Sequence, residues 1–341
     1  MKCPVCGSDC VESAHELLET LGTVFAPCPD CHGRVLDKRA PLPNRFYETP
    51  CHCNKRFIDE VFAHIYVILE EEGILSGDEP LSRVGMPLIH PGFFMRQAPY
   101  LPPASLVLVS RIITQEAAVR IKKEVPEIRG IVRGGDFTPG IASLDNGTEP
   151  RSYELLAGCD VRADVFATAS GPLVLYKEQS RIHIEFPRDF NPKIDSVEKR
   201  LLLSVRWFVD AACGTGTLGL AAARAGIRNV VLNDAWGPAA FWTAFNILVN
   251  QEFFSVDEVV MHREYDEIMR NPVGREPVLI AGTRGAQSIS VYQGDLRELY
   301  RVLPTEPVLA VLDLFDKEDT ARSAEVMQAW KSHVTGEVFI P

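Results

Sequence analysis

The chain has 341 residues, which is enough for two or three domains. Its composition, with 46% apolar and 24% charged residues, is typical of a soluble globular protein. A mean hydropathy of +0.00 and the lack of an 18-residue apolar run argue against a membrane protein. The N-terminus lacks an apolar signal core, so we expect a cytoplasmic protein that does not bind membranes.

The cysteines are concentrated at one end, since seven of the nine lie in the first 53 residues. Two C-x2-C knuckles, Cys3–Cys6 and Cys28–Cys31, present thiolates at the spacing that a single tetrahedral metal ion requires. We therefore predict a zinc-ribbon-like module over residues 1–55 whose zinc ion is held by all four of these thiols. Four thiolates leave no open coordination position, so the metal would be structural rather than catalytic.

The remaining cysteines of this region indicate a possible second metal site. Its ligands would be Cys10, Cys51 and Cys53. Cysteine-rich segments also bind iron–sulfur clusters, and the sequence leaves zinc and an iron–sulfur cluster open as alternatives.

The next segments are a helix, a connector and a small mixed domain. Apolar residues recur at helical spacing over 56–75, and residues 77–105 are rich in proline, so 56–105 reads as a helix followed by a loop. Residues 106–187 alternate strand and helix patterns and predict a small α+β domain. Its last predicted strand is 181–186, on which His183 is expected to face solvent.

A glycine-rich turn follows a buried strand at Asp210. The run Asp210-Ala-Ala-Cys-Gly214-Thr-Gly216 leads into an alanine-rich helix, and the next strand ends at Asp234. Glycines let a ligand approach the backbone, and an acidic residue at the second strand end accepts hydrogen bonds from ribose hydroxyls. Gly219 completes a G-x-G-x-x-G pattern, so an NAD-linked oxidoreductase stays possible, although Asp210 before the turn favours a different ligand.

This segment resembles the class I S-adenosylmethionine-dependent methyltransferases. The resemblance covers 188–341 and extends to Arg188-Asp-Phe-Asn-Pro-Lys193 and to the strand–Gly–Asp–x–Arg–Glu motif around Asp295, features similar to tRNA guanine methyltransferases and wybutosine-pathway relatives. It implies an α/β, Rossmann-like domain. The cofactor-binding positions that it implies are Asp210, Ala211, Gly214, Gly216, Asp234, Ala235, Asp295 and Leu296. It assigns the methionine part to the glycine turn, the ribose to Asp234 and the adenine to Asp295.

The chain departs from the family pattern in three places. The fourth strand of the domain ends in Leu312-Asp313-Leu314-Phe315-Asp316 rather than in a base-methyltransferase motif. The sequence separation between Asp234 and Asp295 is long for the family and predicts an insertion around 255–285. The chain stops after the predicted strand 337–340, where the family adds a hairpin, so we expect a domain shortened at its C-terminus.

The carboxyl end of the fourth strand is where an acceptor is expected, which makes Asp313 and Asp316 the candidate catalytic residues. The acceptor is open between tRNA-like RNA and a protein or small metabolite. The net charge of −11 is spread over all parts of the chain and weakens the RNA analogy. A local basic group could still bind tRNA: Lys38, Arg39, Arg45, Lys55 and Arg56. The alternative function is a non-catalytic zinc-ribbon binding protein with a degenerate methyltransferase fold.

Overall fold

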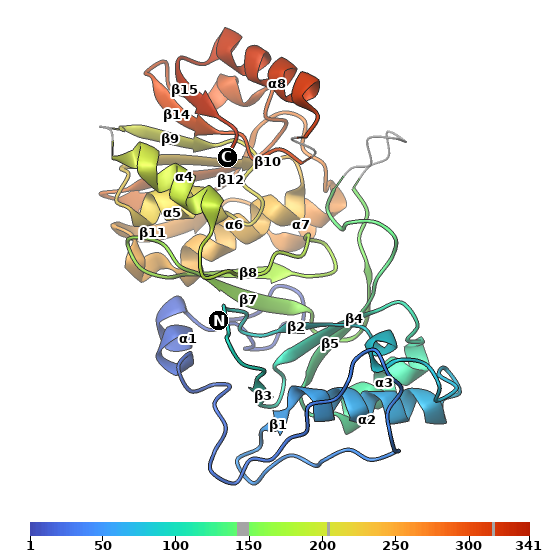
Figure 1. Cartoon of the computed structure of the whole chain (residues 1–341). Coiled ribbons are helices and arrows are strands. Elements are labelled where there is room, and N and C mark those ends of the chain that lie inside the picture. Colours follow the sequence, from blue (N-terminus) through green and yellow to red (C-terminus); the bar gives the residue numbers. More distant parts are fainter. Residues whose placement is uncertain (142–149, 203–204, 316–317) are drawn as a thin grey trace.

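A computed structural model describes residues 1–341 except 142–149, 203–204 and 316–317. Figure 1 shows the C-terminal half as a sheet with helices on its faces, and the N-terminal half as a smaller sheet with its own helices. The candidate Asp316 lies outside the described residues. No helix in the described part of the chain is long and apolar enough to cross a membrane.

The larger sheet has seven strands in the order β11-β12-β13-β10-β9-β14-β15. The strands β13, β10, β9, β14 and β15 are all parallel, which is the order of a doubly wound nucleotide-binding fold. The predicted Rossmann-like α/β class is therefore confirmed. The strands are β9 (Trp207–Asp210), β10 (Asn229–Asp234), β11 (Val256–Met261), β12 (Val278–Gly285), β13 (Ser288–Gln293), β14 (Val308–Val311) and β15 (Gly336–Phe339).

The expected insertion around 255–285 forms the hairpin-like extension β11–β12, which pairs antiparallel with β13 at one edge of the sheet. At the opposite edge, β15 pairs only with β14 among the described strands. The helices of this half are α4 (Pro192–Leu201), α5 (Thr217–Arg224), α6 (Gly237–Val249), α7 (Tyr265–Arg270) and α8 (Thr320–His333).

Alternate residues of the parallel strands supply two separate cores. Phe208 and Val230 belong to the core that α4, α5 and α6 cover, whereas Val209 and Val231 belong to the core under α8. Because successive side chains of a strand point to opposite faces, strands buried on both sides read as unbroken apolar runs. Asn191 begins α4 by accepting hydrogen bonds from the N–H groups of Lys193 and Ile194.

The N-terminal half contains a four-stranded sheet in the order β2-β4-β5-β6. The parallel pair β4–β5 is joined by α3, which begins where Thr114 accepts a hydrogen bond from the N–H of Ala117. The elements of this half are α1 (Ala14–Thr20), β1 (Arg56–Phe57), α2 (Ile58–Glu71), β2 (Met86–Ile89), β3 (Tyr100–Leu101), β4 (Leu106–Ser110), α3 (Gln115–Glu124), β5 (Ile128–Arg133) and β6 (Glu154–Gly158).

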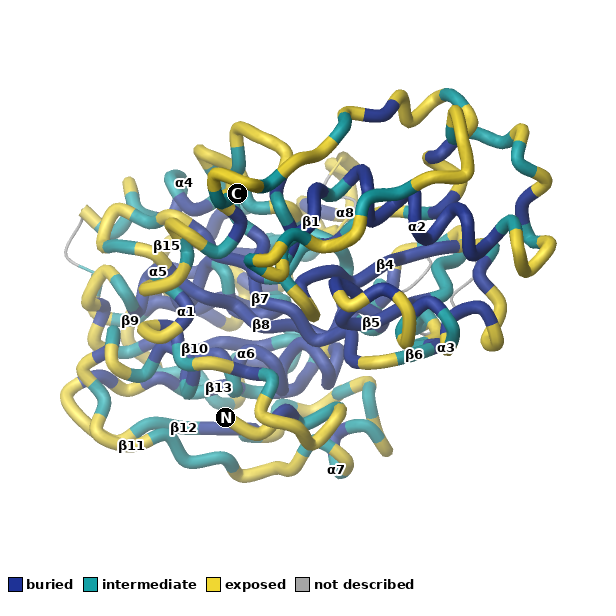
Figure 2. Tube along the Cα trace, turned by 90° about the horizontal axis from the view of Figure 1, so that it is seen from below, coloured by how far each residue is buried: buried dark blue, intermediate teal, exposed yellow. Residues whose placement is uncertain are grey.

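A two-stranded ribbon, β7 (Val161–Phe166) with β8 (Leu173–Glu178), lies between the two halves (Figure 1). Every residue of both strands is buried, as the dark tube in Figure 2 shows. The ribbon shares its core with α5 and α6 and with the N-terminal residues Val11, Ala14 and Leu17. The expected boundaries 106–187 and 188–341 thus cross one continuous core, and they stay predictions.

Candidate active site

The turn after β9 has the backbone that its glycines predict. Gly214 and Gly216 lie in the left-handed region, with φ of +56° and +97°. A Cβ atom at Gly214 would meet only the His183 ring, at 3.8 Å, so the backbone there is open to a ligand. A Cβ at Gly219 would lie 1.8 Å from a methyl carbon of Leu232. Gly219 therefore serves the packing of α5 on β10, and not the approach of a ligand.

Asp210 ends β9 with a carboxylate that is 1% exposed. Its Oδ2 accepts a hydrogen bond of 2.9 Å from the N–H of Gly219, while its buried Oδ1 has no partner among the described residues. Desolvation, followed by the negative charge of Asp313, holds the pKa of Asp210 well above its usual range. The fold thus buries an acidic group beside the glycine turn, although its desolvation opposes folding.

Asp234 ends β10 and links that strand to the turn. Its Oδ2 accepts from the N–H of Gly214 at 2.9 Å, and its Oδ1 accepts from the N–H of Trp236 at 2.8 Å. Burial raises the pKa of Asp234 to about 6, although both hydrogen bonds favour the ionised form.

Asp313 follows β14 on the other side of β9. Its Oδ2 lies 2.6 Å from Nζ of Lys193 in α4, and its buried Oδ1 has no partner in the described structure. Strand β9 lies between β10 and β14, so the chain reverses its winding direction between β9 and β14. Open α/β sheets bind ligands at such a switch point. Two buried, partnerless carboxylate oxygens at this point suit a ligand that carries positive charge.

Asp295 lies farther away, after β13, on the far side of β10 from β9. Burial alone would raise the pKa of Asp295, but hydrogen bonds from the Arg297 side chain and backbone lower it. Its own N–H donates to the carbonyl of Arg275 at 2.9 Å. Of its predicted companions, Ala211 is buried, Ala235 is exposed and Leu296 is half-buried.

The prediction for His183 is wrong. Strand β8 ends at Glu178 and the chain then turns, since the N–H of Ile182 bonds to the carbonyl of Glu178 at 3.0 Å. The turn carries His183 over Gly214, where its ring meets Phe315 edge-on with centroids 5.1 Å apart. Burial, with the charges of Lys177 and Lys193, lowers the pKa of His183 to about 3, so the imidazole is neutral at pH 7.

The sequence gives no signal for the role of Asn246, which is fully buried in α6. Its amide donates to the carbonyl of Thr215 in the glycine turn at 3.0 Å and to that of Tyr176 in β8 at 3.0 Å, and it accepts from the N–H of Tyr176 at 2.7 Å. Asn246 therefore holds the turn against the ribbon. Asn246 and Asn250 are one helical turn apart and therefore lie on the same face of α6. The sequence does not show that this face packs against the ribbon, so their role is visible only in the structure.

The cysteines form two groups of four, and neither is the expected set of Cys3, Cys6, Cys28 and Cys31. The ligand sulfurs in each group lie within 4.8 Å of one another. The two knuckles separate because α1 carries the first toward the ribbon core, whereas Phe25 and Leu36 place the second on the core of α2. The groups are Cys3, Cys6, Cys10 and Cys159, and Cys28, Cys31, Cys51 and Cys53.

The expected basic group is largely neutralised within the molecule. Lys38 pairs with Asp59, and the Arg45 guanidinium lies 3.5 Å from the Glu70 carboxylate, both on α2. Arg56 forms a fully buried pair with Glu127. Lys55 donates to two backbone carbonyls, those of Thr23 and Ala26. These contacts help to hold the N-terminal half together, while the Lys38 and Arg45 side chains stay 51% and 62% exposed.

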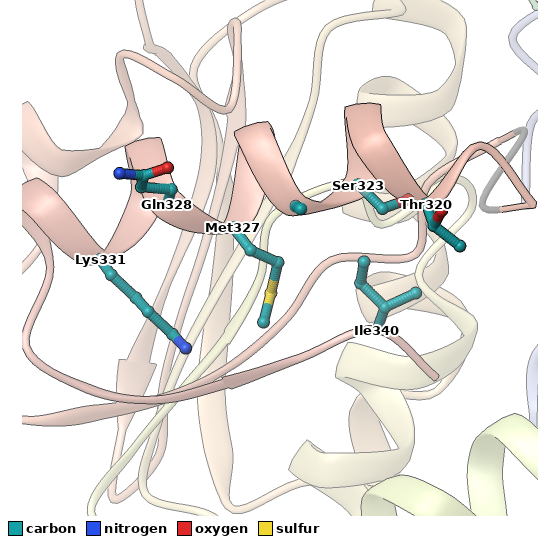
Figure 3. Close-up of a pocket in the computed structure, with 7 residues that line it drawn as sticks. Thr320, Ser323, Met327, Gln328, Lys331 and Ile340 are labelled. Carbon is teal, nitrogen blue, oxygen red and sulfur yellow. The ribbon is translucent and has the colours of Figure 1, made fainter.

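A hollow of about 520 Å³ lies beneath α8 (Figure 3), and its lining includes none of Asp210, Asp234 and Asp313. Met327 and Ile340 supply its apolar wall, and Lys331 stands at one end. It contains none of the predicted site residues.

No known family profile matches the chain, and no curated protein matches it. Several solved structures do. TYW2 from Pyrococcus horikoshii, in complex with MeSAdo, has 16% identity and a TM-score of 0.41 and covers 82% of this chain and 78% of its own. Trm1 from the same organism, with S-adenosyl-L-methionine, has 18% identity and a TM-score of 0.37, over 52% of this chain and 42% of its own. The tRNA m1G37 methyltransferase of Methanocaldococcus jannaschii has 14% identity and a TM-score of 0.33, over 64% and 53%.

Proposed function

We propose that the chain is an S-adenosylmethionine-dependent methyltransferase. The observation that carries this proposal is the pair of buried, partnerless oxygens, Asp210 Oδ1 and Asp313 Oδ1, beside the open backbone of Gly214. S-adenosylmethionine has a sulfonium and an ammonium group, and a site that already bears the cost of burying carboxylates gains when a cation enters it. The solved structures similar to the chain are tRNA methyltransferases and a related protein, which agrees with this proposal.

The residues divide by the part of the cofactor that each would hold. Asp210, Gly214 and Gly216 would hold the methionine part, and Asp234 would accept hydrogen bonds from the ribose while keeping the turn in place. Asp295 and Leu296 would meet the adenine edge, with Ala211 and Ala235 lining the path between them.

S-adenosylmethionine supplies an activated methyl group, and transfer is an in-line displacement that an enzyme accelerates mainly by positioning the acceptor. Asp313 stands where the acceptor would enter. Its Oδ2 is held by Lys193 and its Oδ1 is left to accept a proton from an acceptor that must lose one. The neutral His183 ring and Phe315 would border the same opening.

Among acceptor classes we propose a tRNA-like RNA first, because the tRNA methyltransferases named above are similar over much of the chain. The pairing of Lys38, Arg45 and Arg56 with carboxylates reduces the local positive charge that would attract RNA. A protein or small-molecule acceptor is therefore the second candidate. The partnerless carboxylates favour a cationic ligand, and the labelling experiment below separates a methyltransferase from the non-catalytic alternative.

We also propose that the cysteine-rich part binds zinc. Thiolate ligands in fours are the donor set of structural zinc sites, and they leave no position for a reacting group. The cysteines are free thiols, which a reducing cytoplasm preserves and which can then bind metal. We propose that the protein works in this compartment.

Calorimetric titration with S-adenosylhomocysteine tests cofactor binding. We expect wild type to bind with a 1:1 stoichiometry and Asp234→Ala to lose binding, while Asp257→Ala, an exposed carboxylate on β11, serves as the control and binds like wild type. Absence of binding by a folded wild-type chain would sink the proposal.

The acceptor is found by supplying methyl-labelled S-adenosylmethionine to fractionated cell RNA, protein and small molecules. Label in the tRNA fraction is expected. Label only in protein or small molecules would replace RNA by the second candidate, and binding of the cofactor without label in any fraction would favour the non-catalytic alternative.

A further inference from the structure

We infer that the chain holds two separate single-ion metal sites, and that one of them joins the extreme N-terminus to Cys159 and thereby supports the cofactor turn. Site 1 is Cys3, Cys6, Cys10 and Cys159; site 2 is Cys28, Cys31, Cys51 and Cys53. The inference rests on the proposed zinc binding for the identity of the metal, while the coupling to the turn rests on the proposed cofactor site.

The sulfur–sulfur distances indicate how many metal ions each group of cysteines would hold. A zinc–sulfur bond of about 2.3 Å places the corners of a tetrahedron about 3.8 Å apart. Cys159 Sγ lies 3.8 Å from Cys3 Sγ and 3.9 Å from Cys10 Sγ. In site 2, Cys28 Sγ lies 3.6 Å from Cys51 Sγ and 3.7 Å from Cys31 Sγ. An iron–sulfur cluster would spread its thiolates over several iron atoms and hold them farther apart, so the geometry favours one ion for each group.

A buried positive charge lies next to site 1. The buried guanidinium of Arg129 donates to the carbonyl of Cys10 at 2.6 Å and also to that of Val161. A divalent ion with four thiolates carries a net charge of −2, which this cation partly balances. The first three ligands come from one short loop, in which the N–H of Gly7 bonds to the carbonyl of Cys3 at 2.9 Å. Cys159 comes from the corner between β6 and β7.

Site 2 is more exposed and is closed by local turns. The N–H of Cys28 donates to Cys31 Sγ, 3.4 Å away. The second pair of ligands lies on a turn closed by a 2.9 Å hydrogen bond from the N–H of Cys51 to the carbonyl of Lys55. This site belongs to the N-terminal half, and its ligands make no contact with the glycine turn in the described part of the chain.

A short chain of contacts leads from site 1 to the glycine turn. Just after Cys10, the N–H of Glu12 donates to the Tyr176 hydroxyl on β8 at 3.0 Å. The backbone of Tyr176 is held on both sides by Asn246, which also donates to Thr215 of the turn. Removing the ion from site 1 therefore loosens the ribbon that supports the turn, whereas removing it from site 2 does not.

The test compares Cys159→Ser with its matched control, Cys53→Ser, in the full chain. Elemental analysis should find two zinc ions per wild-type chain and one in each variant. The dissociation constant of S-adenosylhomocysteine should rise about tenfold in Cys159→Ser and stay within twofold of wild type in Cys53→Ser, which corresponds to about 1.4 kcal/mol for the first variant. Because Cys159→Ser risks misfolding, Cys159→His, which keeps a zinc ligand, should retain both ions and the wild-type affinity.

Three results would overturn the inference. One ion per wild-type chain would show that the two groups are not separate sites. Acid-labile sulfide would show an iron–sulfur cluster. Equal effects of Cys159→Ser and Cys53→Ser on affinity would remove the coupling to the turn. A wild-type chain with two zinc ions that fails to bind S-adenosylhomocysteine would overturn the cofactor proposal and the coupling that rests on it, while the two metal sites would stand.

Discussion

At the scale of single residues, the buried carboxylates of Asp210 and Asp164 are compensated in different ways. The Asp164 carboxylate is as deeply buried as that of Asp210, but it lies 2.8 Å from Lys177 Nζ and is also paired with Arg162. Asp210 accepts a hydrogen bond from the N–H of Gly219 on Oδ2, and its Oδ1 has no partner among the described residues. The proposed function assigns this difference to ligand binding, and because Asp160 is also buried with a partnerless Oδ1, a variant has to test the assignment.

Asp210→Asn should raise the stability of the ligand-free chain and weaken cofactor binding. The amide removes an uncompensated buried charge, and trade-offs of this kind are common at functional sites. Thermal unfolding with and without S-adenosylhomocysteine checks both effects. In the matched variant Asp164→Asn, breaking the buried pairs should cost about 3–5 kcal/mol. A less stable Asp210→Asn chain that binds normally would contradict the assignment.

Cofactor affinity should fall as the pH falls through about 6. Burial raises the pKa of Asp234 to about 6 from 3.8, so this group favours folding at low pH and its contribution is lost as the pH rises through about 6. The ribose hydroxyls that we assign to Asp234 would donate to its ionised form, so cofactor binding would expel the proton. The dissociation constant should therefore rise up to about tenfold per pH unit below this range. Calorimetry at pH 5.5 in buffers of different ionisation enthalpy measures the released proton, and no release would count against the role of Asp234.

At the scale of elements, predictions that rest on local signals agree with the structure, whereas a strand predicted from alternation alone does not. The start of the predicted α+β segment is confirmed by strand β4 at 106–110 and by α3, which Thr114 caps, because propensity and capping act within a few residues. The predicted strand 181–186 fails although its residues alternate. Its backbone has no neighbouring strand to pair with, and it turns back on Glu178 instead.

Helix α6 offers a matched pair of variants. Asn246 and Asn250 are both fully buried and both bond to the backbone of β8, but only Asn246 reaches the glycine turn. Each alanine variant should cost about 1–3 kcal/mol, because buried backbone groups lose their partners. Asn246→Ala should also weaken S-adenosylhomocysteine binding several-fold, whereas Asn250→Ala should bind within twofold of wild type. Chemical unfolding and calorimetry on both variants test this, and equal binding would refute the positioning role.

At the scale of the whole molecule, acidic residues of α2 hold the N-terminal segment on the smaller core. Glu60 is fully buried and accepts from Arg34 Nε at 2.7 Å and from the N–H of Glu48 at 2.9 Å. Burial opposes ionisation of Glu60, but the hydrogen bonds from Arg34 and Glu48 lower its pKa overall. Stability from this group is therefore present above pH 4.5 and is lost as the pH falls below it.

Glu60→Gln should release the segment around Arg34 without affecting the cofactor site. Limited proteolysis should then cut the chain between residues 34 and 48 faster than in wild type, and S-adenosylhomocysteine binding should be unchanged. The exposed pair of Arg284 and Glu258 supplies the control, since Glu258→Gln should change neither property. Equal cleavage of Glu60→Gln and wild type would show that the pair does not hold the segment.

The sequence by itself determined what depends on neighbours along the chain: the glycine turn after β9, the acidic ends of β9 and β10, the order of strands and helices, and the knuckle turns of the cysteines. Only the tertiary structure decided which of these features meet. It brought Asp313 and His183 to the turn, divided the cysteines into two groups with Cys159 in one, and paired Lys38 with Asp59 of α2. The reason is physical: turns and caps are local, whereas partners of a thiol, a carboxylate or a guanidinium are chosen by packing between segments up to 237 residues apart.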